Sequence, residues 1–386
     1  MKPLSRTAIR ISAAVFWTLA LVRLVWLYES AQGVDGWDYA IYDLGVERAF
    51  SGEDPYRQIG IETGFINHPG LLLVAYPFHL LGAAGSWVWL AASLIAWLAA
   101  VFLSFRAHER RAELLVLLFS LTAAAEGLFA GQAGIPAVLC LAVAYRFHRR
   151  EKEIAAGILI GLAAVFKLSL GVFILFFLLK KRFGAAAAGL ATLVLFSATA
   201  EWLLFPGING LFFVSMAGLV GSAYPGVHNA SLYHPSFTPV IGAFMLASLA
   251  WVVYRRGDRV PERLAFGGFA AWTLLTSPLT WHHHFVLLAL PLAWLLAERP
   301  WVGIALAGLI QIDLLGQRIG LPFHTGILAA VGIYLLFIII PYAPLPGNRS
   351  ARLPPPDDLP GQHPGRPGDE FPVRPVPDRH HHRPVR

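Results

Sequence analysis

Residues 184–205 read GAAAAGLATLVLFSATAEWLLF, and the charged side chain in this stretch, Glu201, lies near its end. A helix needs about 20 predominantly apolar residues to cross the hydrocarbon core of a bilayer, so the stretch is long enough to span a membrane. Similar apolar runs recur along most of the 386-residue chain, which is 56% hydrophobic and only 14% charged. Soluble domains carry about 25% charged residues. The sequence therefore predicts an integral membrane protein with several spans.

The apolar runs show no alternation of polar and apolar residues. Because backbone groups in lipid must be paired within the protein, a spanning segment is either an α-helix or a strand of a closed barrel. Strands of membrane barrels alternate between apolar and polar side chains. The expected fold class is thus an all-α, polytopic membrane bundle.

The first predicted span, about residues 11–28, follows Lys2, Arg6 and Arg10. Basic residues flank the cytoplasmic ends of spans, so we expect the N-terminus in the cytoplasm. A cleaved signal peptide is the alternative. No clear small-x-small cleavage site follows Leu27, and many more apolar runs come after it. We therefore expect an uncleaved, multi-pass protein of the cell inner or plasma membrane.

The polar stretch at about residues 29–69 is rich in acids and is expected to form an extracytoplasmic loop. Half of the lysines and arginines lie instead in short clusters between later runs, which predicts that these turns are cytoplasmic. The clusters are Arg106–Arg111, Arg146–Lys152, Lys180–Arg182, Arg255–Arg263 and Arg299. Basic residues distributed in this way indicate topology and not a nucleic-acid-binding face.

The chain is predicted to divide into two parts. Residues 1–343 form the transmembrane domain, with further spans up to its end. Residues 344–386 are rich in proline, arginine and histidine and lack the apolar content needed to fold, so they are expected to be a disordered cytoplasmic tail.

Lys167 interrupts the apolar stretch 154–179, which is too short for two full spans. A charge at mid-membrane costs at least about 2.5–3.5 kcal/mol. We predict two half-length helices that meet at Lys167; a single tilted span is the alternative. Since Lys167 has no acidic neighbour in sequence, we expect it to bind an anionic ligand.

Other polar residues stand close to the predicted outer ends of spans. Asp38 follows the first span among aromatic residues, where it would act as a general base or be an ordinary solvated aspartate. Gln132 lies at a predicted tight turn after Gly131, where a glycine permits close backbone approach. Glu126 lies near the outer end of an apolar run and is expected to be an interface residue.

His282, His283 and His284 lie between two apolar runs. Three successive side chains point in different directions on a helix, so they are not expected to bind one metal ion, whose ligands are usually spaced further apart. Contacts to a phosphate or a hydroxyl are the expected role. Interface residues without a function are the alternative.

Several of these segments, in this order, resemble motifs of glycosyltransferase family 87. The matching segments are Asp38-Tyr39-Ala40-Ile41-Tyr42, Ala49-Phe50-Ser51-Gly52-Glu53-Asp54-Pro55-Tyr56, Gly131-Gln132, Ala156-Gly157 with Gly161-Leu162-Ala163-Ala164-Val165-Phe166-Lys167, and Ser277-Pro278-Leu279-Thr280-Trp281-His282-His283-His284. The chain departs from the family's pattern at His68-Pro69, at Leu168-Ser169 and at Thr280, which stands where a serine is usual.

The resemblance implies a GT-C-type helical bundle with its active site under the first extracytoplasmic loop. It implies an inverting transfer of a sugar, with mannose favoured, from a polyprenyl-phosphate donor to a glycolipid or glycan acceptor. Asp38 would be the general base. Lys167, His283 and His284 would neutralise or bind the leaving phosphate, Gln132 would position sugar or phosphate, and Arg57 is a weaker candidate. No cofactor or metal ion is required by these residues, and no nucleotide-binding fingerprint occurs.

Two other functions stay open at this point. A transporter or flippase for a lipid-linked or anionic substrate would also place polar groups within a membrane. Transporters often have two related halves with broken helices in matching positions, whereas this chain has one convincing break. A non-catalytic partner in a cell-envelope complex would tolerate replacement of the polar loop residues.

Overall fold

The computed structural model describes residues 6–31, 37–57, 65–104, 121–221, 235–236, 238–256, 262–318 and 325–339. Within these ranges every regular element is a helix, so the predicted all-α class is confirmed there. The predicted tail, residues 344–386, and the basic cluster Arg106–Arg111 lie outside the described residues.

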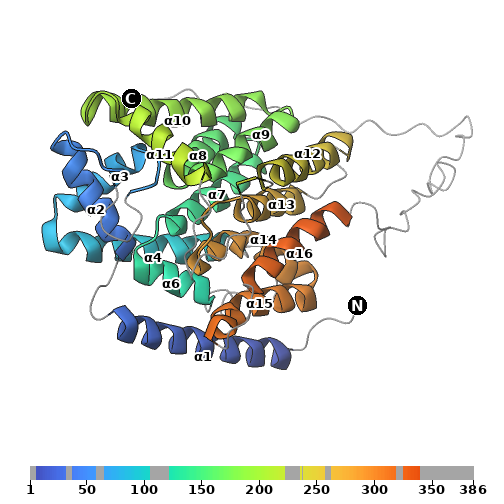
Figure 1. Cartoon of the computed structure of the whole chain (residues 1–386). Coiled ribbons are helices and arrows are strands. Elements are labelled where there is room, and N and C mark those ends of the chain that lie inside the picture. The colour runs from blue at the N-terminus through green and yellow to red at the C-terminus, as the bar shows by residue number, and fades with distance from the viewer. Residues whose placement is uncertain are drawn as a thin grey trace, which may run out of the picture. The chain divides into compact units, whose positions relative to one another are not determined.

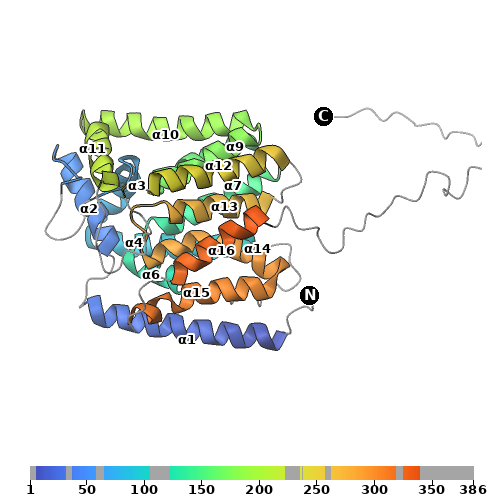
Figure 2. The same cartoon turned by 45° about the vertical axis from the view of Figure 1, so that its right-hand side comes forward.

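The α-helices are drawn in chain order in Figures 1 and 2. They are α1 (Arg6–Ala31), α2 (Trp37–Phe50), α3 (Gly70–His79), α4 (Gly85–Ser104), α6 (Thr122–Ala130), α7 (Gly134–His148), α8 (Glu153–Phe166), α9 (Val172–Leu179), α10 (Phe183–Leu203), α11 (Ile208–Gly221), α12 (Thr238–Arg256), α13 (Glu262–Leu275), α14 (Ala289–Glu298), α15 (Pro300–Arg318) and α16 (Thr325–Ile339). Short 3-10 turns connect some of them: η1 (Gly82–Ala84), η2 (Leu168–Gly171) and η4 (His282–Leu288).

Three segments of the described chain are long and apolar enough to cross a membrane: Gly82–Ser104, Phe183–Leu203 and Thr238–Arg255. Only 22–33% of their most apolar windows is buried inside the protein. Large side chains such as Ile95, Leu195 and Phe244 point outward from them. Exposed apolar surface of this extent is what a lipid-facing helix presents, so the protein is a helical membrane protein.

Helices α1 and α10 lie on opposite sides of the bundle in both views, with the other long helices between them (Figures 1 and 2). The first predicted span, residues 11–28, lies within α1. Helix α10 packs closely on α8 because glycines line their contact. A Cβ atom added to Gly157 would lie 2.0 Å from the carbonyl oxygen of Ala185. Small residues at this contact allow the two backbones to approach, as in other membrane bundles.

The predicted break at Lys167 is present. Helix α8 ends at Phe166, Lys167 has an extended backbone (φ −149°, ψ 104°), and η2 leads into the short helix α9. The alternative of one continuous span is therefore wrong. The physical reason is the charge of Lys167, which a continuous apolar helix would place on an apolar face. The break brings the residue instead to a cavity that has a partly polar lining.

The predicted first loop is partly helical. Residues 37–50 form α2, which packs against α3 and α6. Tyr39, Tyr42, Val46 and Ala49 are buried at helical spacing, and this periodicity stabilises a helix although the segment is acidic. The alternative of a solvated Asp38 is also wrong, since its side chain is buried.

Ion pairs join several helix ends that carry basic residues. Arg149, which follows α7, lies 3.4 Å from Glu262 at the start of α13. Arg263 on α13 pairs with Glu298 at the end of α14 at 2.7 Å. At the start of α8, Glu153 accepts from Arg182 at 2.7 Å. Nε2 of His148 lies 3.3 Å from Oε1 of Glu262, and this contact is the main cause that lowers the pKa of Glu262 to about 2.

Candidate active site

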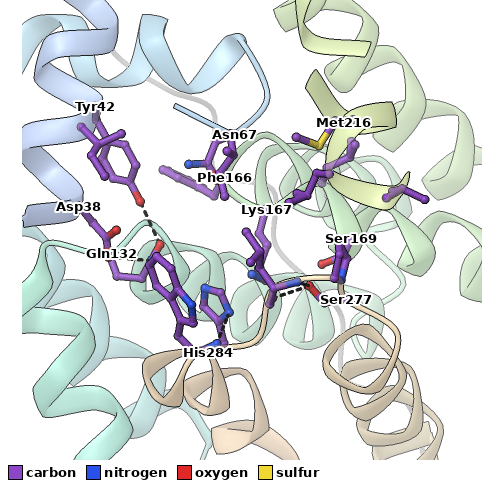
Figure 3. Close-up of a pocket in the computed structure, with 18 residues that line it drawn as sticks. Asp38, Tyr42, Asn67, Gln132, Phe166, Lys167, Ser169, Met216, Ser277 and His284 are labelled. Carbon is purple, nitrogen blue, oxygen red and sulfur yellow. Dashed lines mark hydrogen bonds between the residues drawn. The ribbon is translucent and has the colours of Figure 1, made fainter. Parts of the chain in front are cut away.

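A cavity of about 320 Å³ lies where α2, the α6–α7 turn, the α8–η2 break, α11 and the segment before η4 come together (Figure 3). Its polar lining includes Asp38, Tyr42, Gln132, Lys167, Ser169 and His284. Its apolar lining includes Phe166, Leu168, Met216, Leu219, Val220 and Leu279. Four of the residues predicted from the sequence, Asp38, Gln132, Lys167 and His284, therefore share one cavity.

Asp38 is positioned by the first turn of α2 and by Gln132. The residue is 5% exposed. Its Oδ2 accepts a hydrogen bond of 3.0 Å from Nε2 of Gln132. Tyr42, one helical turn later, donates to Oε1 of Gln132 at 2.9 Å and accepts from the backbone N–H of Ala133 at 3.2 Å. The carboxylate is thus held by an amide whose own orientation is fixed.

Gln132 owes its position to the tight turn between α6 and α7. Gly131 has a left-handed backbone (φ 72°), and a Cβ atom there would lie 2.8 Å from Cβ of Tyr39. The indole N–H of Trp89 donates to the carbonyl of Gly131 at 2.7 Å. The predicted turn at this glycine is confirmed, and it directs the next side chain toward Asp38.

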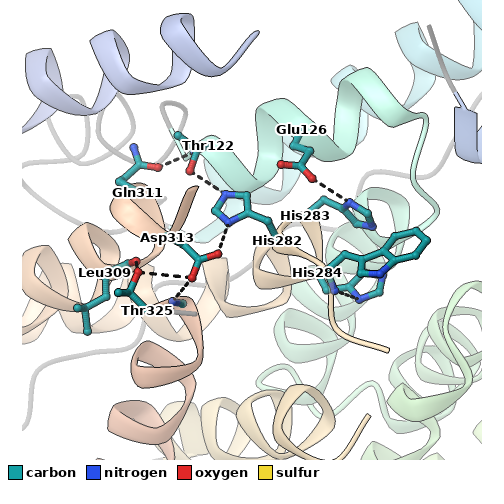
Figure 4. Close-up of polar contacts among 11 residues, drawn as sticks. Thr122, Glu126, His282, His283, His284, Leu309, Gln311, Asp313 and Thr325 are labelled. Atoms are coloured by element: carbon teal, nitrogen blue, oxygen red, sulfur yellow. Dashed lines mark hydrogen bonds and ion pairs between the residues drawn. The ribbon is translucent and has the colours of Figure 1, made fainter. Parts of the chain in front are cut away.

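The three consecutive histidines have different surroundings (Figure 4). His282 lies 3.0 Å from Oγ1 of Thr122 and 3.2 Å from Oδ2 of Asp313. His283 lies behind the cavity wall, with Nε2 2.9 Å from Nε2 of Gln132. His284 lines the cavity, and its Nδ1 accepts from the backbone N–H of Trp281 at 3.2 Å. Within the described ranges, no group of three or more His, Cys, Asp and Glu side chains could hold a metal ion.

Lys167 and Ser169 form the side of the cavity opposite Asp38 and Gln132 (Figure 3). The side-chain oxygen of Ser169 is buried and has no hydrogen-bond partner among the described residues. A buried hydroxyl without a partner loses about 1–3 kcal/mol of hydrogen bonding. A cation and an unpaired hydroxyl on one wall are suited to an anionic ligand.

The structure places Glu126 and Arg57 elsewhere than the sequence predicted. Glu126 was expected at the membrane interface, and this expectation is wrong. Glu126 is 6% exposed, and its Oε1 lies 3.4 Å from Nδ1 of His283. Arg57 is exposed and does not line the cavity; its backbone carbonyl accepts from Arg48 at 3.1 Å. The structure does not bring Arg57 to the other candidates.

Sequence reasoning missed Tyr42, Ser169 and Glu126. Tyr42 follows Asp38 by one helical turn, so a helical reading of the segment would have placed both on one face. Glu126 is an acid within an apolar run, the same signal that identified Lys167. Ser169 is marked in the sequence only by the Leu168-Ser169 departure from the family's pattern, which does not indicate that its buried hydroxyl lacks a hydrogen-bond partner among the described residues.

Comparison with known proteins gives matches to one kind of enzyme. The model of a family described as glycosyltransferase family 87 matches residues 65–278. The chain is also similar to a polyprenol-phosphate-mannose-dependent α-(1-2)-phosphatidylinositol pentamannoside mannosyltransferase of Mycolicibacterium smegmatis. The two are 26% identical over 325 residues, which cover 76% of this chain and 77% of the relative. No solved structure matches the chain.

Proposed function

This chain belongs to glycosyltransferase family 87 and is a glycosyltransferase, and from that premise we propose that it transfers mannose from a polyprenyl-phosphate donor to a glycolipid or glycan. The relative's name supports both choices, because that enzyme depends on polyprenol-phosphate-mannose and acts on a phosphatidylinositol mannoside. Membership of a glycosyltransferase family favours an enzyme over the transporter that the sequence had left open.

In the proposed reaction Asp38 is the general base. The acceptor hydroxyl oxygen bonds to the anomeric carbon while its proton passes to the carboxylate of Asp38. The bond from that carbon to the donor phosphate breaks, and its electron pair leaves with the phosphate. A single displacement of this kind inverts the anomeric configuration. The hydrogen bond from Gln132 at 3.0 Å orients Asp38 for this step.

The leaving group is a polyprenyl phosphate, and its negative charge increases as the bond breaks. We assign its stabilisation to Lys167, with Ser169 and His284 as further hydrogen-bonding groups on the cavity wall. Fixed charges and dipoles aimed at developing charge contribute most to catalysis of this type. The apolar wall formed by Met216, Leu219 and Val220 on α11 suits the first part of the polyprenyl chain.

We place the cavity on the extracytoplasmic side from the distribution of charge. The basic ends of α7, α8, α10 and α13 share ion pairs and would be cytoplasmic. Helix α8 has 14 residues, so Lys167 lies about 21 Å from its basic end. The hydrocarbon core is about 30 Å thick, which puts a residue at that height in the outer half when α8 runs along the membrane normal.

The observation that carries the proposal is the buried Asp38, held by Gln132 and facing Lys167 across one cavity. Purified protein should be incubated with a panel of polyprenyl-phosphate sugars and a phosphatidylinositol mannoside acceptor. We expect consumption of the mannosyl donor and a product larger by one mannose. Consumption of a different sugar donor would overturn the choice of mannose, and consumption of none would overturn the proposed donor class.

The assignment of Asp38 needs its own variant. Asp38→Asn keeps the size of the side chain and a hydrogen-bonding oxygen but removes the basic carboxylate. We expect transfer to fall by about 100-fold or more, the contribution typical of general acid–base catalysis, while expression and thermal stability are retained. Asp43→Asn, which removes an acid on α2 that pairs with His79 outside the cavity, is the matched control. Activity of Asp38→Asn near that of the control would exclude Asp38 as the base.

A further inference from the structure

Glu126 is a buried carboxylate next to the cavity, and the proposed reaction gives it no role. It lies on α6, and its Oε1 is 3.4 Å from Nδ1 of His283, a ring that is itself 1% exposed (Figure 4). Removing a carboxylate from water is costly unless hydrogen bonds or opposite charges compensate. Apolar side chains would fill this site in a membrane protein without that cost. The contact with His283 therefore points to a specific function.

The contacts of His283 determine which ring nitrogen carries the proton. Nε2 of Gln132 is an amide nitrogen, which can donate but not accept. It lies 3.0 Å from Oδ2 of Asp38 and 2.9 Å from Nε2 of His283. The hydroxyl of Tyr42 donates to Oε1 of Gln132 and so fixes this orientation of the amide.

It follows that Nε2 of His283 is the unprotonated acceptor and Nδ1 carries the hydrogen. This hydrogen faces Glu126 at 3.4 Å. The other tautomer would set an Nε2–H against the N–H of Gln132. To avoid this contact the amide would have to turn, and Asp38 would lose the hydrogen bond that orients it.

We propose that Glu126 is a positioning residue that acts on Asp38 through His283 and Gln132. Its carboxylate accepts the Nδ1 hydrogen and keeps the Nε2 lone pair directed at Gln132. Gln132 then uses both amide hydrogens, one for His283 and one for Asp38. This inference rests on the proposed function, in which Asp38 is the general base.

The other charged groups around His283 serve different contacts. Asp313 on α15 lies beside His282 at 3.2 Å and accepts the backbone N–H of Gly326 at 2.7 Å. Lys167 lines the cavity together with His284. Oδ2 of Asp38 is 3.9 Å from Nε2 of His283, on the far side of the ring from Glu126. Of these charged groups, Glu126 is the one that faces Nδ1 of His283, and it sets the tautomer from that side.

Two variants test the role of Glu126 in the full-length protein, with polyprenyl-phosphate mannose and a phosphatidylinositol mannoside as probes. Glu126→Leu removes the acceptor and its charge, and Glu126→Gln retains a neutral acceptor. We expect kcat to fall by about 10- to 100-fold for the leucine variant, by analogy with the loss of partners that orient metal-bound histidines, and by less for the glutamine variant. The donor KM should change by less than about twofold, because the donor is not contacted. Glu153→Gln is the control. Glu153 pairs with Arg182 at the start of α8 and does not line the cavity, so this variant should keep wild-type kcat.

Thermal stability separates positioning from a structural role. Glu126→Leu leaves the buried Nδ1 hydrogen of His283 without its acceptor, which costs about 1–3 kcal/mol of stability whatever the role of Glu126. Glu126→Gln keeps an acceptor, so this variant should unfold close to the wild-type temperature while its kcat falls. A loss of stability in parallel with kcat in Glu126→Gln would show a structural role and overturn the inference. Unchanged kcat in Glu126→Leu would overturn it as well.

A double-mutant cycle gives a second, independent measurement. If Glu126 acts through His283, Glu126→Leu should cause little further loss of kcat in a His283→Asn background. Fully additive losses would overturn the inference. If the wild-type protein transfers no mannose, the proposed function itself is rejected. This result is distinguishable from a failure of the inference about Glu126, because it is obtained before any variants are compared.

Discussion

Lys167 is the residue at which the proposed phosphate site is most directly tested. Lys167→Met keeps the length of the side chain and removes its charge. A hydrogen bond to a charged group contributes about 1.5–3 kcal/mol, so we expect kcat/KM for the donor to fall by roughly 10- to 150-fold. Stability should not fall, because the variant no longer places a charge at the break between α8 and η2. Initial rates at varied donor concentration measure this, and an unchanged kcat/KM would remove Lys167 from the phosphate site.

Individual residues were predictable from sequence where a charge interrupts an apolar run or a motif is recognisable. Lys167 was identified because its charge interrupts an apolar run. Asp38, Gln132 and His284 were identified by their positions near the ends of apolar runs and also by their motifs. Glu126 was misassigned because its position near the end of an apolar run fits an interface residue equally well. Its true surroundings depend on η4, a segment distant in sequence whose His283 turns toward α6. Contacts between distant segments are what a single sequence does not specify.

Two turns between helices contain non-glycine residues in the left-handed region. These are Glu151 (φ 58°), between α7 and α8, and Lys181 (φ 56°), between α9 and α10. The left-handed conformation costs roughly 1–2 kcal/mol for a residue with a Cβ atom, and Lys181 is exposed. We expect Lys181→Gly to raise stability by about 0.5–1 kcal/mol, after allowing for the flexibility that glycine adds to the unfolded chain.

The preceding residue provides the control for this turn. Lys180 has a backbone φ of −81°, which a side chain adopts without strain, so Lys180→Gly should be neutral or destabilising. The temperature at which half of the purified protein remains monodisperse after heating measures both variants. A lower temperature for Lys181→Gly than for wild type would show that the turn is not strained.

At the level of elements, the sequence predicted helices best where the run was long and apolar. Residues 184–205 predicted α10, and Gly131 predicted the turn between α6 and α7. The helix α2 was not anticipated because the acidity of residues 29–69 obscured the buried spacing of Tyr42, Val46 and Ala49. Acidic side chains on one face are compatible with a helix when the other face packs against its neighbours.

For the whole molecule, the proposed sidedness leads to a labelling experiment. The native Cys140 is buried and can be replaced by serine, which leaves a background for single cysteines. Ser51 follows α2, the helix whose first part lines the cavity, and Lys181 lies in the basic turn between α9 and α10; both are exposed. A membrane-impermeant maleimide applied to intact cells should label Ser51→Cys at once and Lys181→Cys only after the membrane is permeabilised. The expectation follows from the excess of basic residues at the ends that the ion pairs Arg149–Glu262 and Arg182–Glu153 bring together. Labelling of both variants in intact cells, or the reverse order, would place the cavity on the cytoplasmic side or change the number of crossings between α2 and α10.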